Sequence, residues 1–380
     1  RQHGSHPHEH AAGSPLAVMP HSPTRRDCLK GLALLGAGSA IPLAGAQAAD
    51  ISDARLLLGG TLASIQGQFA ELAAGVISHT LGLDAPLEIT PDIGQDGVRA
   101  ANLFDANTAP DGSTALIAPG SVLLASLTGD SRVHYDFTRW TPLLTAHTTT
   151  VVIARAELHK TLKSRLKGFF HDHPVRLAVS RPTGTELDAL LGLTLLGLRP
   201  IPVSGFVRTE DALDALANNQ VDAVQLLPYT LGVPVEDILA KLPPDTVPLY
   251  HTGDLAETSA NSIPNFLEAY QQARRRPPEG ALYRAWQAVS ASTYTALTVA
   301  LPMLTPPDLV KSWQKACWDA AVDPTVHRWA EKHHFMLAAG DNAAPFLSRA
   351  TPDIGAILAL RRWIAMNTPR WRLGQETRPL

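Results

Sequence analysis

The chain has 380 residues, of which 45% are hydrophobic and 18% are charged, and its formal net charge is −3 at pH 7. This composition supports packed cores and is not that of a disordered protein. With 32 basic and 35 acidic side chains and no basic stripe, the chain is not expected to bind nucleic acid. No apolar run approaches the roughly 20 residues of a membrane-spanning helix. The two cysteines are too few for a disulfide scaffold or a cysteine-rich zinc site.

Residues 1–49 predict a disordered extension followed by an export signal. The part before Met19 holds several histidines but no apolar periodicity, which favours a solvated segment over a metal site. The pair Arg25-Arg26 precedes a short apolar stretch, and Ala46-Gln47-Ala48 supplies the small residues that a signal peptidase recognises. The arginine pair resembles a twin-arginine signal. We expect export to the periplasm with cleavage near Ala48, by either the twin-arginine or the general route, and with Met19 as an alternative start.

Short apolar runs alternate with amphipathic segments after the signal. This alternation predicts an α/β fold with mostly parallel sheets. The chain after the predicted signal is too long for a single hydrophobic core, so two lobes are expected. Strands are predicted at 55–58, 87–90, 114–118, 149–154, 175–179, 201–203 and 221–226. Helices are predicted at 65–77, 98–107, 187–196, 210–217, 264–276, 283–289, 307–321, 324–334 and 345–366.

Three loops at the carboxyl ends of predicted strands are candidates for a ligand site, because open α/β sheets bind ligands there. Glycines expose backbone N–H groups, and the N-terminus of a following helix favours an anion such as a carboxylate. Each loop alone is common in proteins, so the prediction depends on two or three of them meeting at one cleft. The candidates are Gly59, Gly60, Thr61 and Ser64 in the first loop, Gly120 and Ser121 in another, and Ser180, Arg181, Thr183, Gly184 and Thr185 in the third.

The sequence lacks the motifs of the common enzyme classes. No G-x-G-x-x-G follows a predicted strand, and Walker A, H-E-x-x-H and G-x-S-x-G patterns are missing. His333 and His334 are adjacent, so on a helix they diverge and make a poor ligand pair. His171-Asp172-His173 could hold a metal, but a solvated loop is the favoured interpretation. We therefore expect no catalytic residue, no metal and no cofactor.

Seven segments in chain order carry a resemblance to one family. Pro110-Asp111-Gly112-Ser113-Thr114 resembles its P-D-G-Y-T segment, and Ala178–Thr185 resembles its S-x-G-x-G-S ligand loop. On these motifs, residues 52–366 resemble the solute-binding receptors of tripartite tricarboxylate transporters, often called Bug receptors. The other matching segments are Gly59-Gly60, Pro91–Gly97, Tyr135–Leu143, Pro202–Gly205 with Ala215–Ala223, and Asp323–Val326.

The resemblance implies a two-lobed periplasmic-binding-protein fold of type II, a flytrap that closes on its ligand. Residues 50–146 and 251–380 would form lobe I, and residues 147–250 would form lobe II. Such receptors hold a small organic anion, a carboxylate, in the cleft between the lobes and deliver it to membrane subunits. We expect a monomer without a cofactor. The resemblance also implies that Gly205 lies near the binding loops.

Two departures from the family pattern bear on the ligand. The first loop has no acidic residue after its glycines, which disfavours an amino group on the ligand. The glycine that the family has near the position of Pro182 is missing, and Arg181 directly precedes Pro182. Arg181 could bind a second carboxylate through its planar guanidinium, or it could be a surface arginine. Two alternative functions remain open: an enzyme on the same fold, and a receptor that serves a membrane sensor kinase.

Overall fold

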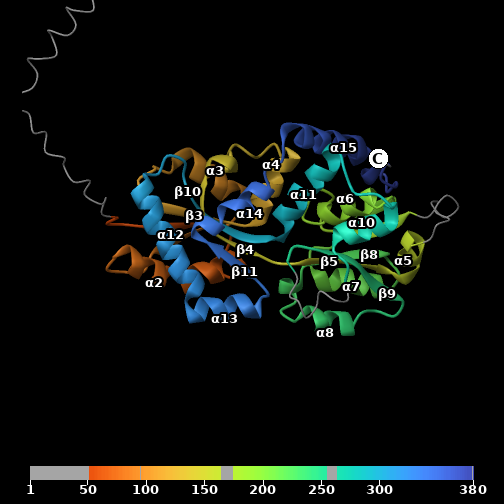
Figure 1. The fold of residues 1–380 in the computed structure, drawn as a ribbon, viewed down its shortest axis with the longest axis horizontal. Helices are drawn as coiled ribbons and strands as arrows, with labels where there is room; N and C mark the ends of the chain where they lie inside the picture. Colours follow the sequence, from red (N-terminus) through yellow and green to blue (C-terminus); the bar gives the residue numbers. More distant parts are fainter. Residues whose placement is uncertain (1–50, 95, 164–173, 255–262, 379) are drawn as a thin grey trace, which may run out of the picture. The chain divides into compact units, whose positions relative to one another are not determined.

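The computed structural model describes residues 51–94, 96–163, 174–254, 263–378 and 380 (Figure 1). The described residues all belong to one compact unit. The predicted export signal and His171-Asp172-His173 lie outside the described residues. None of the described helices combines the length and apolar character that crossing a bilayer requires.

The first sheet has six strands in the order β11-β4-β10-β3-β1-β2. Strand β1 pairs in parallel with β2 and β3, whereas β10 and β11 pair antiparallel with their neighbours. The strands are β1 (Arg55–Gly59), β2 (Glu88–Asp92), β3 (Thr114–Ala118), β4 (Thr141–His147), β10 (Thr295–Leu301) and β11 (Met336–Ala339). The accompanying helices are α2 (Ile65–Leu81), α3 (Val98–Asn107), α4 (Gly120–Thr128), η1 (Phe137–Arg139), α12 (Pro307–Val322), α13 (Pro324–Lys332), η3 (Gly340–Asn342) and α14 (Ala344–Arg349).

The second sheet has five strands in the order β7-β6-β8-β5-β9. Strand β6 pairs in parallel with β7 and β8, and β5 pairs antiparallel with β8 and β9. The strands are β5 (Thr150–Arg155), β6 (Val175–Val179), β7 (Pro200–Ser204), β8 (Ala223–Leu226) and β9 (Thr246–Thr252). The accompanying helices are α5 (Ala156–Lys163), α6 (Leu187–Leu195), α7 (Thr209–Ala217), η2 (Pro228–Thr230), α8 (Val235–Ala240) and α10 (Phe266–Arg274).

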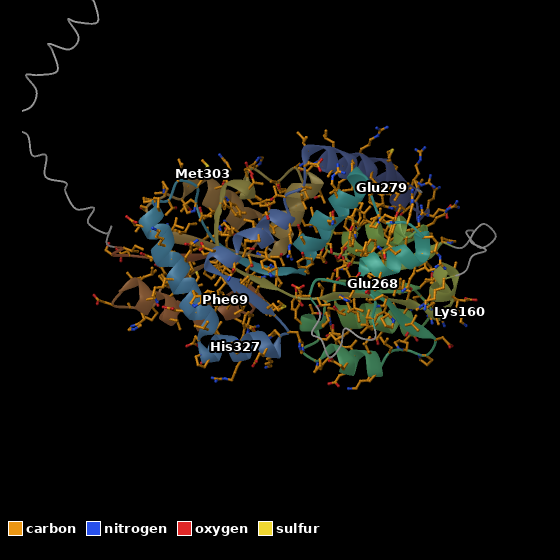
Figure 2. All side chains as sticks on the ribbon, viewed as in Figure 1. Phe69, Lys160, Glu268, Glu279, Met303 and His327 are labelled. Carbon is orange, nitrogen blue, oxygen red and sulfur yellow. The ribbon has the colours of Figure 1, made fainter. Side chains whose placement is uncertain are left out.

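Two helices join the two sheets into one unit. Helix α11 (Ala281–Tyr294) packs on α4, α6 and α15, and α15 (Ile354–Arg372) also packs on α4 (Figure 1). One buried apolar cluster therefore contains Leu127 of α4, Leu190 of α6 and Trp363 of α15. A second buried cluster packs against the first sheet and contains the fully buried Phe69 of α2 (Figure 2). The ring of Phe69 packs on Trp329, with centroids 5.9 Å apart.

The two sheets, each with its own helices, confirm the predicted two-lobed α/β architecture. The prediction that the sheets are mostly parallel is corrected, because four pairings among the described strands are parallel and five are antiparallel. Four of those antiparallel pairings involve β4, β9, β10 or β11, which the sequence did not predict. The lobe boundaries at 146/147 and 250/251 stay a prediction.

The long helix predicted over 345–366 is also corrected, because α14 and α15 are separate. Pro352 disfavours helical backbone at the preceding residue. Asp353 then starts α15, because its carboxylate accepts a hydrogen bond from the N–H of Ala356.

Candidate functional site

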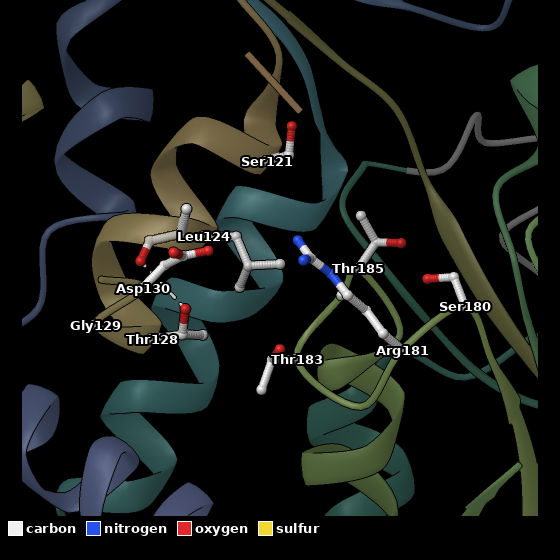
Figure 3. Close-up of a pocket in the computed structure, with 11 residues that line it drawn as sticks. Ser121, Leu124, Thr128, Gly129, Asp130, Ser180, Arg181, Thr183 and Thr185 are labelled. Atoms are coloured by element: carbon white, nitrogen blue, oxygen red, sulfur yellow. Dashed lines mark hydrogen bonds between the residues drawn. The ribbon is translucent and has the colours of Figure 1, made fainter. Parts of the chain in front are cut away.

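A cavity of about 350 Å³ lies between helix α4 and the loop that follows strand β6 (Figure 3). The cavity brings together six of the twelve residues that the sequence predicted for the site, namely Ser121, Ser180, Arg181, Thr183, Gly184 and Thr185. The remaining lining residues are Leu124, Ala125, Thr128, Gly129 and Asp130, all from α4 or the turn after it.

The loop from Ser180 to Glu186 is fixed by its own backbone and by the neighbouring strand. The N–H of Gly184 donates to the carbonyl of Arg181 at 2.9 Å. The carbonyl of Thr185 accepts from the Gln225 side chain at 3.1 Å and from the Thr293 hydroxyl at 3.3 Å. The loop is thus held against β8 and α11. Such anchoring favours a fixed backbone surface over a loop that must order itself around a ligand.

Ser180 directs its hydroxyl to a carboxylate of its own loop. Its Oγ donates to Glu186 Oε2 at 2.8 Å. Burial raises the pKa of the Glu186 carboxyl above its ordinary value, and the hydrogen bond from Ser180 opposes that rise. The Ser180 hydroxyl therefore serves first to hold Glu186, and its lone pairs remain as acceptors.

Arg181 projects from the loop toward α4 (Figure 3). Its side chain is 53% exposed and forms no hydrogen bond with another described residue. The nearest carboxylate is Asp96, whose Oδ2 lies 3.7 Å from Arg181 Nη2. The guanidinium thus faces the cavity with its N–H donors available.

A chain of alternating charges continues from Arg181 along the cavity. Asp96 Oδ2 also accepts from Arg132 Nη2 at 2.6 Å, and the same nitrogen lies 2.6 Å from Asp130 Oδ2. The hydrogen bond from Arg132 holds the pKa of the Asp130 carboxyl below its ordinary value. Two guanidinium groups therefore face two carboxylates, and the charges of these four groups balance.

Two residues of α4 fulfil structural roles at the edge of the cavity. Ser121 Oγ donates to the carbonyl of Asp96 at 2.8 Å and so ties α4 to the turn after β2. Gly120 does not line the cavity. A Cβ on Gly120 would lie 2.2 Å from the carbonyl oxygens of both Ser292 and Thr295, so only glycine permits this packing.

The first-loop candidates and Gly205 do not line this cavity. Gly59 lies beside the junction of β3 and α4, since a Cβ there would be 3.2 Å from Pro119 Cδ. Ser64 caps α2 by accepting from the N–H of Gly67 at 3.2 Å, and its hydroxyl donates to the Thr61 carbonyl at 2.6 Å. The remaining candidates of this group are Gly60, with φ 153°, and Gly205, whose N–H lies 3.4 Å from the Ser180 carbonyl. Ligand contact by these residues stays a prediction.

The sequence missed three charged residues linked to Arg181, of which Asp130 lines the cavity. Asp96 stands in the turn between β2 and α3, and Asp130 and Arg132 follow the end of α4. A search restricted to Gly- and Ser-rich loops after strands passes over such positions. The spacing of Asp130 and Arg132 was the available signal, because an Asp side chain commonly bonds to backbone two residues later, as Asp130 does with the N–H of Arg132 at 3.0 Å.

Within the described ranges, no group of three or more His, Cys, Asp and Glu residues is placed to hold a metal ion. Cys317 is fully buried in α12, and burial raises its pKa to about 12. Its thiol therefore stays protonated and is unsuited to act as a nucleophile.

The sequence matches no protein-family model and no curated protein. The structure is similar to a TctC solute-binding protein from Polaromonas, solved without ligand, with a TM-score of 0.61 and 12% identity over 83% of this chain and 98% of that one. It is also similar to the periplasmic binding protein BugD, with a TM-score of 0.51 and 15% identity over 83% and 98% of the two chains. MatC from Rhodopseudomonas palustris, solved with bound malate, gives a TM-score of 0.50 and 17% identity over 85% and 99%. The chain thus has the two-lobed fold of periplasmic binding proteins.

Proposed function

We propose that this protein is an extracytoplasmic solute receptor of the Bug type, without enzymatic activity. It binds a small organic anion, a carboxylate, in the cavity between α4 and the loop after β6. It acts in the periplasm as a monomer and delivers the ligand to the membrane subunits of a tripartite tricarboxylate transporter. The observation that carries the proposal is the half-exposed Arg181 guanidinium, which faces a cavity lined by hydroxyl groups and loop backbone.

The dimensions and chemistry of the cavity support a small acid. Its volume of about 350 Å³ falls at the low end of the range of about 300–1,000 Å³ for small-molecule sites. Thr183, Gly184 and Thr185 lie just before α6, where helix N–H groups and the helix dipole favour negative charge. Arg181 adds a bidentate carboxylate partner from the same loop.

The fold supports the receptor class, and MatC supports the ligand class by analogy. The MatC structure contains malate, a small dicarboxylate with a hydroxyl group. A ligand of this size could place one carboxylate on Arg181 and the other on the backbone of Thr183 to Thr185. The missing acidic residue in the first loop argues against an amino group on the ligand.

A thermal-shift screen followed by calorimetry tests the proposal. A ligand at about 100 times its Kd adds about 2.7 kcal/mol to the free energy of unfolding, which raises the melting temperature by a few degrees. We expect shifts with dicarboxylates or hydroxy acids and with no neutral sugar. Replacing Arg181→Ala should weaken binding of the best acid about tenfold or more, because a charge-assisted bidentate pair is lost.

Arg208→Ala is the matched control, since Arg208 is an exposed arginine of the same lobe that does not line the cavity. We expect its affinity to equal that of the unmodified protein. The proposal is wrong if no organic acid binds, or if a bound acid is converted to another compound.

A further inference from the structure

Arg181, which lines the cavity, meets Asp96 from the other sheet. Arg181 follows β6 of the second sheet, and Asp96 follows β2 of the first sheet. Their closest charged atoms, Arg181 Nη2 and Asp96 Oδ2, are 3.7 Å apart. The two residues therefore form an ion pair between the two sheets, and its Arg181 member lines the cavity where the proposed ligand would bind.

The two members of this pair are held unequally. Asp96 is anchored on its own side, because Arg132 donates to its carboxylate at 2.6 Å and Ser121 donates to its carbonyl at 2.8 Å. The Asp96 side chain is 20% exposed, against 53% for Arg181. Among the described residues, Asp96 is the only carboxylate within ion-pair distance of Arg181. Asp96 can lose Arg181 and still keep a cationic partner, whereas Arg181 would then interact only with the more distant charges of Asp130 and Glu186.

We propose that Asp96 is the internal counter-ion of Arg181 and sets the charge specificity of the cavity. The inference rests on the proposed function and concerns the same site. A ligand carboxylate that binds Arg181 takes the place of Asp96, and Asp96 returns to Arg132 alone. Because Asp96 lies 3.7 Å from the guanidinium and repels an incoming anion, it lowers the affinity for every anionic ligand that reaches Arg181.

Because of the competition with Asp96, only a ligand group that interacts strongly with a guanidinium can bind Arg181. A carboxylate has the planar, bidentate geometry that matches a guanidinium, so it can replace Asp96. A neutral hydroxyl or amide in the same position would leave the Arg181–Asp96 pair in place. The site therefore selects an acid with one carboxylate for Arg181 and a second polar end for the backbone of the loop from Thr183 to Thr185.

Asp96→Asn is the variant that tests this inference. It keeps an oxygen for Arg132 to donate to and removes only the charge that competes for Arg181. We expect the Kd for succinate, malate or glutarate, whichever binds the unmodified protein best, to fall about fivefold, as for a half-exposed ion pair. A neutral analogue such as succinamide has no carboxylate to compete with Asp96 and should show no gain.

Two further variants separate a specific pair from a general change in charge. Glu88→Gln changes the net charge equally, but Glu88 is exposed at the opposite end of β2 and outside the cavity, so it should leave the Kd unchanged. In the double-mutant cycle with Arg181→Gln, Asp96→Asn should give no gain, because the residue for which Asp96 competes is gone. Melting curves of each variant confirm that it is folded.

The results distinguish this inference from the function on which it rests. If dicarboxylates bind and Asp96→Asn changes nothing, weakens binding, or gives the same gain without Arg181, the counter-ion role is wrong and the receptor function stands. If neither the unmodified protein nor any variant binds an organic acid, the proposed function is wrong, and the inference fails with it.

Discussion

Asp188 is a buried carboxyl group that the site does not use. It lies in the first turn of α6, is 1% exposed, and has one oxygen without a hydrogen-bond partner among the described residues. Its other oxygen accepts from the Thr252 hydroxyl at 3.4 Å. Burial raises the pKa of Asp188 to about 7, against the lowering effect of nearby hydrogen-bond donors. The protonated carboxyl is thus the favoured form in the fold under mildly acidic conditions.

This raised pKa predicts a pH-dependent loss of stability. From about pH 4 to about pH 7 the folded chain binds the Asp188 proton and the unfolded chain does not, so the free energy of unfolding falls as pH rises and then levels off. Asp188→Asn mimics the neutral form and should remove that part of the fall. Urea unfolding at about pH 5 and about pH 8 gives the change in the free energy of unfolding for each protein. Subtracting the change in Asp188→Asn from that in the unmodified protein removes the contribution of the other titrating groups. Equal changes in both proteins would contradict the assignment.

The candidate site was predictable only in part at the level of single residues. Arg181 was found because it stands in a Gly- and Thr-rich loop after a predicted strand, where anion sites are common. Asp96 and Arg132 were missed because their relation to Arg181 is spatial. They lie 85 and 49 residues before Arg181 in the sequence (181 − 96 and 181 − 132), and only the folded chain brings them together.

Among the secondary-structure elements, the parallel strands were predictable and most of the antiparallel ones were not. The parallel strands β1, β3 and β6 are short apolar runs that end in Gly, Pro or Ser. In contrast, β10 begins at Thr295 directly after α11 ends at Tyr294, with no turn residue between them. All seven of its residues are buried, so it also lacks the alternation that identifies a half-buried strand.

The start of α4 depends on a close approach of backbone to backbone. Gly120→Ala would place a methyl group 2.2 Å from two carbonyl oxygens of the α11–β10 junction. We expect a loss of about 2 kcal/mol or more in the free energy of unfolding, because neither oxygen belongs to a flexible side chain. Denaturant unfolding provides the measurement.

Gly75→Ala is the matched control in a helix with open space. Gly75 lies inside α2, and a Cβ there would meet nothing within 4 Å. Alanine should stabilise this helix by about 0.5–1 kcal/mol. If Gly120→Ala raises the free energy of unfolding as Gly75→Ala does, the inferred close packing at the start of α4 is wrong.

For the molecule as a whole, the shared apolar cluster predicts that both lobes unfold together. Leu127 belongs to α4, which packs on β10 of the first sheet, yet it lies in a cluster with α6 of the second sheet. Scanning calorimetry should therefore give a single transition whose calorimetric and van't Hoff enthalpies agree. Leu127→Ala should lower its midpoint without splitting it, at a cost of about 2–5 kcal/mol.

Leu358→Ala is the comparison for this prediction, since Leu358 lies on α15 with 60% of its surface exposed. Its replacement should leave the midpoint within about 1 °C of that of the unmodified protein, as surface substitutions usually do. Two resolved transitions in the unmodified protein would show that the lobes are independent and that the cluster does not couple them.

The tail after α15 is part of the structure. Thr377 is fully buried, and both its N–H and its hydroxyl donate to the carbonyl of Pro200 in β7. Trp371 donates to the Thr377 hydroxyl at 3.0 Å, and the N–H of Arg378 donates to the buried Asn367 at 2.6 Å. An engineered biosensor shortened before Thr377 would lose these hydrogen bonds at the edge of the second sheet, so a fluorophore is better attached beyond Arg378, where Leu380 is 60% exposed.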